Sequence, residues 1–268
     1  MIQQGRTLLA LLFAAACLAL PVGAWAGNVL IINGSTLTSE TGTTADITAN
    51  LSALETAAGN VPTVMDVPPA SLAGFDEVWD IRFSNSSPLS VSDQALYLAF
   101  LQAGKKMFIM GENAFFTTRN NSVIALVASA GGGALTFVVP AQTQTVNPPF
   151  TLPNPVSSIT WNASGGTTSP GSGFFATNSG SSGSAIAWNP GSLANAAAAR
   201  LVVVFDVNFM QAGASTNENN FFKNLIGFIT TGGGGGSLEV PTLSVWALIA
   251  LSLFVALFAV RVGTRRRT

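Results

Sequence analysis

The sequence predicts an α/β domain with a parallel sheet and helices on both faces, followed by a C-terminal transmembrane helix. From Asn28 onward, short apolar runs alternate with amphipathic stretches, as in strands connected by crossover helices. Residues 141–190 interrupt this alternation with Ser, Gly, Asn, Thr and Pro, and are expected to be an insertion with room for β-hairpins. Residues 241–260 carry no charge and would span about 30 Å as a helix, which matches a bilayer core.

The expected strands are short apolar segments bounded by turn residues. They cover residues 28–34, 62–67, 77–83, 105–111, 135–139 and 201–209. The expected helices have apolar residues at helical spacing and cover residues 43–58, 90–104, 122–130 and 218–230. The helix at 90–104 begins with the capping pattern Ser90-Val-Ser-Asp and stops at Gly104.

Composition excludes several kinds of chemistry. The chain has no histidine, and its one cysteine is Cys17, so Cys/His zinc sites, Ser-His-Asp triads and Cys-His dyads cannot form. Without a disulfide, an exported domain must be stabilised by its core. Residues 27–240 contain six basic and twelve acidic residues, and this negative charge argues against a nucleic-acid partner. No motif predicts a cofactor or a metal site.

The N-terminus is typical of a signal peptide over residues 1–26. Arg6 precedes an apolar run of about 13 residues, about 20 Å as a helix, which is short for an uncleaved anchor. Pro21 ends this run, and Ala24 and Ala26 supply the small-x-small pattern for cleavage after Ala26. A lipoprotein site at Cys17 is the alternative, and it is disfavoured because apolar residues follow the cysteine.

At the other end, residues 232–239 begin with five glycines and are expected to be a flexible linker. The apolar span at 241–260 is followed by a basic cluster of Arg261, Arg265, Arg266 and Arg267. Because positive charge stays on the cytoplasmic side, this cluster is predicted to act as a membrane stop, with residues 27–231 as the exported domain.

A short motif stands at the start of the tail at residues 240–268. It consists of Val240, Pro241, Thr242, Leu243, Ser244 and Trp246. The motif, span and basic cluster together resemble the IPTL-CTERM sorting signal of Gram-negative bacteria, a relative of the PEP-CTERM tails handled by exosortase-type membrane transpeptidases. The chain departs from the usual motif at Val240, Val245 (usually Glu) and Ala247. The resemblance implies recognition by an exosortase-type enzyme, transient anchoring in the membrane, and delivery to the envelope surface or the exterior.

The order of elements resembles the class I glutamine amidotransferase-like, flavodoxin-like fold. The stretch FIMGENAFFTTRN, residues 108–120, falls where that family places its nucleophile turn, usually Gly-x-Cys-x-Gly. Here Gly111 is followed by Glu112, with no cysteine, and the partner histidine is missing too. The resemblance implies a scaffold without the family's thiol chemistry.

Two carboxylates are the candidate site residues. Glu112 and Asp206 each follow an apolar strand, and the carboxyl ends of parallel strands border the ligand crevice of open α/β sheets. If they converge, they could form an acid/base pair or bind a hard cation. Alternatively, Glu112 caps the next helix or pairs with Arg119, and Asp206 accepts backbone hydrogen bonds. Residues 76, 77 and 80 are also acidic and are expected to be solvated.

Two tryptophans share the pattern Ile-x-Trp-Asn, at Trp161 and Trp188. They could stack on a carbohydrate beside the amides that follow them, or they could pack the insertion onto the sheet, and packing is favoured. The sequence as a whole predicts an exported cell-surface or extracellular-matrix protein with a non-catalytic binding or structural role. The alternative is an exported hydrolase of amidotransferase-like fold that uses Glu112 and Asp206.

Overall fold

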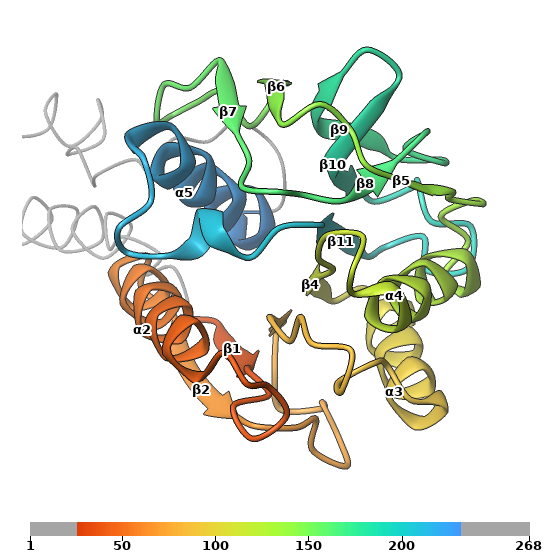
Figure 1. Cartoon of the computed structure of the whole chain (residues 1–268). Helices are drawn as coiled ribbons and strands as arrows, with labels where there is room; N and C mark the ends of the chain where they lie inside the picture. The colour runs from red at the N-terminus through yellow and green to blue at the C-terminus, as the bar shows by residue number, and fades with distance from the viewer. Residues whose placement is uncertain (1–25, 232–268) are drawn as a thin grey trace, which may run out of the picture. The chain divides into compact units, whose positions relative to one another are not determined.

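A computed structural model of the protein describes residues 26–231 and shows eleven strands joined in a single mixed sheet (Figure 1). Five strands form its parallel half, in the order β2-β1-β3-β4-β11. Their bounds are β1 Asn28–Ile32, β2 Val61–Met65, β3 Glu77–Asp80, β4 Lys106–Met110 and β11 Arg200–Val204.

Helices cover both faces of this parallel half. They are α2 Thr41–Ala57, α3 Val91–Gln102, α4 Thr117–Ser129 and α5 Thr216–Thr231, with a short 3-10 helix, η1, at Asn208–Met210. Figure 1 shows α2 and α5 on one side of the strands and α3 and α4 on the other. Successive residues of β1 therefore point to different helices: Val29 and Ile31 join the core under α2 and α5, while Leu30 and Ile32 join the core under α3 and α4.

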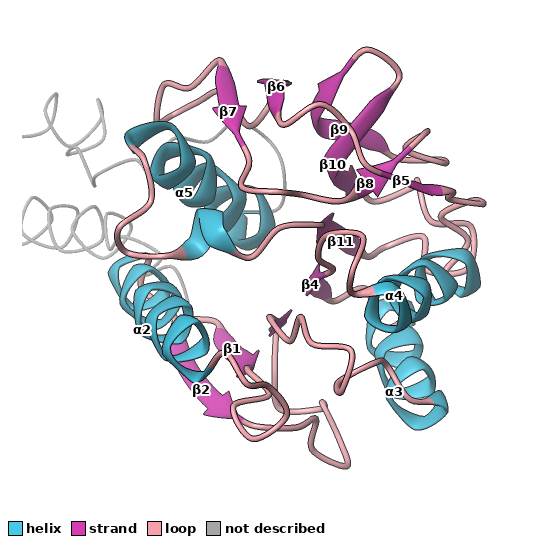
Figure 2. Ribbon diagram, in the orientation of Figure 1, coloured by secondary structure: helices cyan, strands magenta, loops and turns pink. Residues whose placement is uncertain are grey.

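The remaining strands extend the sheet in antiparallel fashion, as Figure 2 shows. They are β5 Phe137–Val138, β6 Thr143–Val146, β7 Ser158–Thr160, β8 Gly166–Thr167, β9 Phe174–Ser179 and β10 Ser182–Trp188. β10 pairs with β11, and the order continues to β9, β6 and β7. The prediction of a flavodoxin-like parallel sheet interrupted by an insertion is therefore wrong, because residues 141–190 supply five strands, β6 to β10, that belong to one mixed sheet.

The composition of residues 141–190 does not predict these strands. Its inward-facing positions include small or polar residues, such as Ala176, Ser184 and Gln144, all of which are buried. Gln144 Nε2 donates to Ser184 Oγ at 2.7 Å, and Thr177 Oγ1 donates to Gln144 Oε1 at 2.9 Å. These hydrogen bonds satisfy polar groups inside the sheet packing, so the strands form without the apolar periodicity used to predict them.

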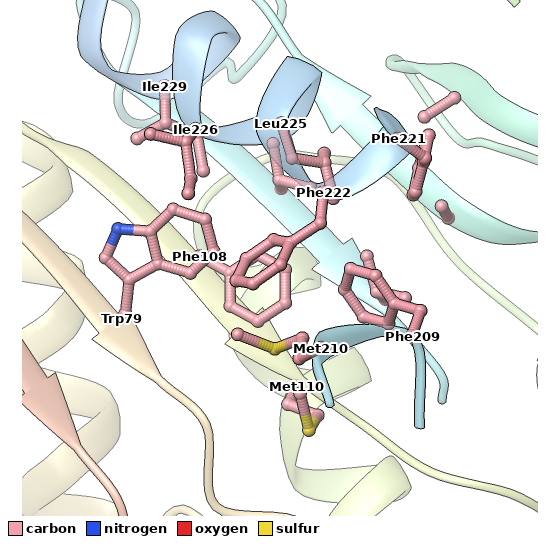
Figure 3. Packing of buried hydrophobic residues seen from close by; sticks show 14 of the residues in the cluster. Trp79, Phe108, Met110, Phe209, Met210, Phe221, Phe222, Leu225, Ile226 and Ile229 are labelled. Carbon is pink, nitrogen blue, oxygen red and sulfur yellow. The ribbon is translucent and has the colours of Figure 1, made fainter. Parts of the chain in front are cut away.

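The core under α2 and α5 is rich in aromatic side chains (Figure 3). Trp79 of β3 stacks on Phe108 of β4 with ring centroids 4.5 Å apart, and Phe222 of α5 meets Trp79 edge-on at 6.1 Å. Such offset and edge-on pairs add to the free energy gained from burying the rings. The closing helix α5 is thereby fixed to the centre of the parallel half.

The predictions for the two ends of the chain fall outside the described residues. These are the signal peptide at 1–26 apart from Ala26, the linker at 232–239, the sorting motif and the arginine cluster. The predicted C-terminal transmembrane helix at 241–260 also lies there. Among residues 26–231, no helix has both the length and the apolar character needed to cross a membrane.

A buried ion network lies where β3 ends. Asp80 is fully buried and accepts hydrogen bonds from Arg82 Nε at 2.9 Å and from Tyr97 Oη at 2.8 Å, and Arg119 Nη2 lies 3.0 Å from Asp80 Oδ1. Burial alone would raise the pKa of Asp80, but the Arg119 and Arg82 guanidiniums outweigh it and lower the pKa to about 2. The expectation that Asp80 is solvated is therefore wrong.

A second buried cluster lies at the opposite, amino end of these strands. Glu77, also expected to be solvated, is buried and accepts from Trp79 Nε1 at 2.5 Å. Burial, and then the neighbouring Glu55, raise the pKa of Glu77. Lys106 and Arg200 donate to backbone carbonyls of the last turns of α5, where cations are favourable. Polar side chains thus attach both ends of the parallel strands to the helices.

We expect Asp80→Asn to lower the free energy of unfolding of the full chain by about 3 to 5 kcal/mol, because Arg119 would remain buried without a counter-charge and Arg82 would keep only Asp93, at 3.3 Å. Urea denaturation at pH 7 would measure this. The matched control is Asp76→Asn, since the exposed Asp76–Lys105 pair at 2.8 Å should contribute about 1 kcal/mol or less. Equal losses in the two variants would contradict the importance of the buried network.

Candidate functional site

The carboxyl ends of β4 and β11 bring Glu112 and Asp206 together. The two strands are parallel neighbours, and Met110 pairs with Val204 at their last shared position. Two residues further on, Glu112 and Asp206 leave the sheet at the same level, at the edge where open α/β sheets bind ligands. Both are buried, with 3% of Glu112 and none of Asp206 exposed.

Glu112 lies in a turn fixed by Asn120 of α4. The Asn120 side chain accepts from the Glu112 amide at 2.8 Å and donates to the carbonyls of Glu112 and Asn113 at 2.8 and 2.9 Å. Glu112 Oε1 accepts from the Asn113 amide at 3.0 Å, while Oε2 is buried with no hydrogen-bond partner among the described residues. Glu112 neither caps α4 nor pairs with Arg119, which belongs to the Asp80 network. The role of Asn120 was missed, since nothing in its local sequence marks it.

Asp206 organises the chain around it through backbone hydrogen bonds. Its Oδ1 accepts from the Asn208 amide at 2.7 Å, and its Oδ2 accepts from the Asn162 amide at 2.9 Å. The first bond shapes the start of η1. The second fixes a segment from the antiparallel region, which we call the strap (residues 162–166).

The strap crosses the carboxyl edge of β4 and β11. The Gly165 amide donates to Phe205 O at 2.9 Å, and a Cβ at position 165 would lie 2.6 Å from Glu112 O, so only glycine fits there. Ala163 has φ +64°, in the left-handed region that non-glycine residues rarely adopt. The strap therefore contacts both acidic positions and helps keep their side chains from solvent.

Burial changes the acidity of both carboxyls. Burial, and then the Asp206 charge, raise the pKa of Glu112 to about 8. Burial also raises the pKa of Asp206 to about 7, against the opposing effect of the Asn208 and Asn162 amides. The pair therefore titrates near neutral pH, as acid/base catalysis requires, although its side chains are inaccessible in this conformation.

Metal binding has less support in this arrangement. Residues 26–231 contain no group of three or more acidic or cysteine side chains placed to hold a metal ion. Glu112 and Asp206 supply only two such groups, whereas a calcium site takes six to eight oxygen ligands.

The two tryptophans considered as sugar platforms are packed inside the domain. Only 3% of Trp161 and none of Trp188 is exposed. Trp161 meets Phe209 and Phe221 edge-on, with ring centroids 5.5 and 5.8 Å away. Neither ring offers a face to a carbohydrate, so the packing interpretation describes both.

Among known protein families, the IPTL-CTERM motif matches residues 240–267 of the tail. The chain ends in an IPTL-CTERM motif. This confirms the resemblance inferred from residues 240–246 and the arginines. The IPTL-CTERM motif indicates an exported protein directed to the cell envelope or surface, and it implies recognition by an exosortase-type processing enzyme.

Solved structures show similarity to the domain at the level of fold. The N-terminal domain of mmIFT52 is 10% identical, with a TM-score of 0.57 over 78% of this chain and 99% of that one. Exo-β-1,4-mannosidase Op5Man5 from Opitutaceae bacterium strain TAV5 is 9% identical, with a TM-score of 0.50 over 81% of this chain and 38% of that one. No curated protein matches the chain in sequence. The amidotransferase-like resemblance stays a prediction.

We expect stability to fall as pH rises, because the neutral form of Glu112 is favoured in the folded protein. The folded pKa is about 8 and the ordinary value is 4.5, so this stability is complete below about pH 4.5 and is lost as pH approaches 8. Glu112→Gln should flatten this dependence and raise the free energy of unfolding at pH 8 by about 2 to 4 kcal/mol.

Chemical denaturation of the full chain from pH 5 to pH 9 would measure this effect. Glu40→Gln is the control, because Glu40 is an exposed carboxylate whose charge also acts on Glu112. Parallel pH profiles for wild type and Glu112→Gln would show that Glu112 does not titrate in this range.

Proposed function

We propose that residues 27–231 are the exported domain of a cell-surface or extracellular-matrix protein with a non-catalytic binding or structural role. The IPTL-CTERM motif is the observation that carries this proposal. The composition of the flanking segments supports it: residues 1–26 suit a signal peptide cleaved after Ala26, and the glycines of residues 232–239 would let a processing enzyme reach the motif.

The geometry of the acidic pair supports the non-catalytic role. A general base must lie within hydrogen-bond reach of a substrate proton, and Asp206 is fully buried beneath the strap. Both of its carboxylate oxygens already accept backbone hydrogen bonds. These contacts explain the burial of Asp206 by a structural role, in which it shapes the loops around it. The chain also lacks the histidine that many hydrolases use.

A hydrolase using Glu112 and Asp206 is the second candidate. The pKa values near neutrality and the position at the carboxyl edge favour it. It would require the strap to move, so that substrate could reach a pair that is inaccessible in this conformation. That requirement makes it the weaker of the two functions.

We expect delivery to the cell surface to depend on the tail motif. In the native host, combined Pro241→Ala and Thr242→Ala substitutions should lower the surface-exposed amount of this protein at least tenfold, measured by surface labelling and fractionation. Val245→Glu is the matched control, because it installs the usual residue of the motif and should leave delivery intact. Intact-mass analysis should show a mature C-terminus near Thr242. Unchanged delivery of the double variant would contradict the proposal.

We expect the purified full chain to turn over no glycoside, ester or peptide substrate. Screening wild type beside Glu112→Gln and Asp206→Asn would test this, since both variants remove a carboxylate at the candidate pair. Turnover by wild type that either substitution abolishes would establish the hydrolase and refute the non-catalytic role.

A further inference from the structure

Phe115 lies in the turn between β4 and α4 and is 86% exposed. The described chain has seven exposed large apolar side chains, and Phe115 is the aromatic one among them. Aromatic rings usually bury most of their surface, so a ring left in water at a sheet's carboxyl edge calls for explanation.

The turn holds Phe115 in a fixed position. The Phe115 amide donates to Asn113 Oδ1 at 2.9 Å, and its carbonyl accepts from Asn85 Nδ2 at 2.8 Å. Asn85 Oδ1 also accepts from the Thr118 amide at 3.0 Å, at the start of α4. On the next residue, the Phe116 ring packs edge-on against Phe83 at 6.2 Å. Both backbone groups of Phe115 are thus bonded to side chains, so the backbone that carries the ring is ordered before a partner binds.

The surrounding loops carry several hydroxyl groups and few charges, which are Glu40 and the Asp66 carboxylate that accepts from Ser35 and Thr36. They follow β1 (residues 33–40), β3 (residues 81–90) and β4 (residues 111–118), where the strand order reverses between β1 and β3. Their exposed polar residues are Ser35, Thr36, Ser39, Asn85, Ser86, Ser90, Thr117 and Thr118. Within these loops Glu40 is the only exposed charged residue, because Arg82 and Glu112 are buried.

This chemistry matches a neutral carbohydrate. A sugar ring has an apolar C–H face that stacks on an aromatic ring, and hydroxyls around its rim that bond to serine, threonine and amide groups. An anionic ligand would require basic side chains, and the exposed residues of these loops include none. A protein interface would require a larger apolar patch, whereas the other large apolar side chains exposed at this edge are the single residues Val67 and Val91.

We propose that the Phe115 turn is a binding platform for a neutral carbohydrate, such as a glycan of the cell envelope or matrix. The Phe115 ring supplies the stacking surface, and the exposed hydroxyls of Ser86, Thr117 and Thr118 supply hydrogen bonds, whereas Asn85 is already bonded within the turn. This inference rests on the proposed binding role and names the ligand class for it. It requires no movement of the strap, because Phe115 is already exposed.

Affinity electrophoresis of the purified full chain tests this, with gels containing dextran, laminarin, galactomannan or xylan. We expect retention of wild type in at least one gel, loss of at least tenfold in affinity for Phe115→Ala, and retention restored in Phe115→Trp. Leu152→Ala is the control, since Leu152 is a 63% exposed apolar side chain elsewhere and its removal should change nothing. Circular dichroism would verify that each variant is folded.

Several results would overturn the carbohydrate platform. One is that no gel retains wild type, and another is that Phe115→Ala is retained as strongly as wild type. A third is that wild type is retained in no gel but forms a dimer in ultracentrifugation that Phe115→Ala dissociates. These results are distinct from a failure of the proposed function. Absence of retention would leave the proposal of delivery by the tail untouched. Shortening of a polysaccharide by wild type would refute the non-catalytic role but not the binding platform.

Discussion

The buried ion network of Asp80, Arg82 and Arg119 is the constraint on which the carboxyl edge depends. Each charge is tolerated only because the others are present, since an isolated buried ion costs several kcal/mol. The network joins the end of β3 to Tyr97 of α3, and Arg119 extends it to the carbonyls of Met110 and Ser87 at 2.9 and 3.0 Å. It therefore fixes two strands, two helices and a loop relative to one another.

The neighbouring features follow from this attachment. Arg119 and Asn120 are adjacent in the first turns of α4. Arg119 belongs to the ion network, and Asn120 forms the hydrogen bonds that shape the Glu112 turn. That turn carries Phe115, whose carbonyl is held by Asn85 from the loop after β3. The result is a rigid edge on which one pair of acids is hidden and one aromatic ring is displayed. The same packing therefore buries the two acids and exposes the Phe115 ring.

Sequence reasoning succeeded where local patterns decide the outcome. The apolar runs at β1, β4 and β11 are unambiguous. Glu112 follows β4 and Asp206 follows β11, and the two residues lie at the same level because parallel strands end at the same edge. It failed where partners are distant or side chains are small. The antiparallel strands β6 to β10 are stabilised by residues such as Gln144 and Ser184, whose burial depends on one another. The pairing of Asp80 with Arg119, and the exposure of Phe115, depend on the tertiary fold and leave no mark in composition.

The position of β11 has a consequence for how the domain is assembled. β11 lies in the interior of the sheet between β4 and β10, yet residues 200–204 come near the end of the domain, and α5 must still follow to cover Trp79 and Phe108. A polypeptide threaded out of the cell N-terminus first has no partner for that edge of β4 until almost the whole domain has emerged. Contacts so far apart in sequence form late, so the parallel half of the sheet is completed only once residues 200–231 are available.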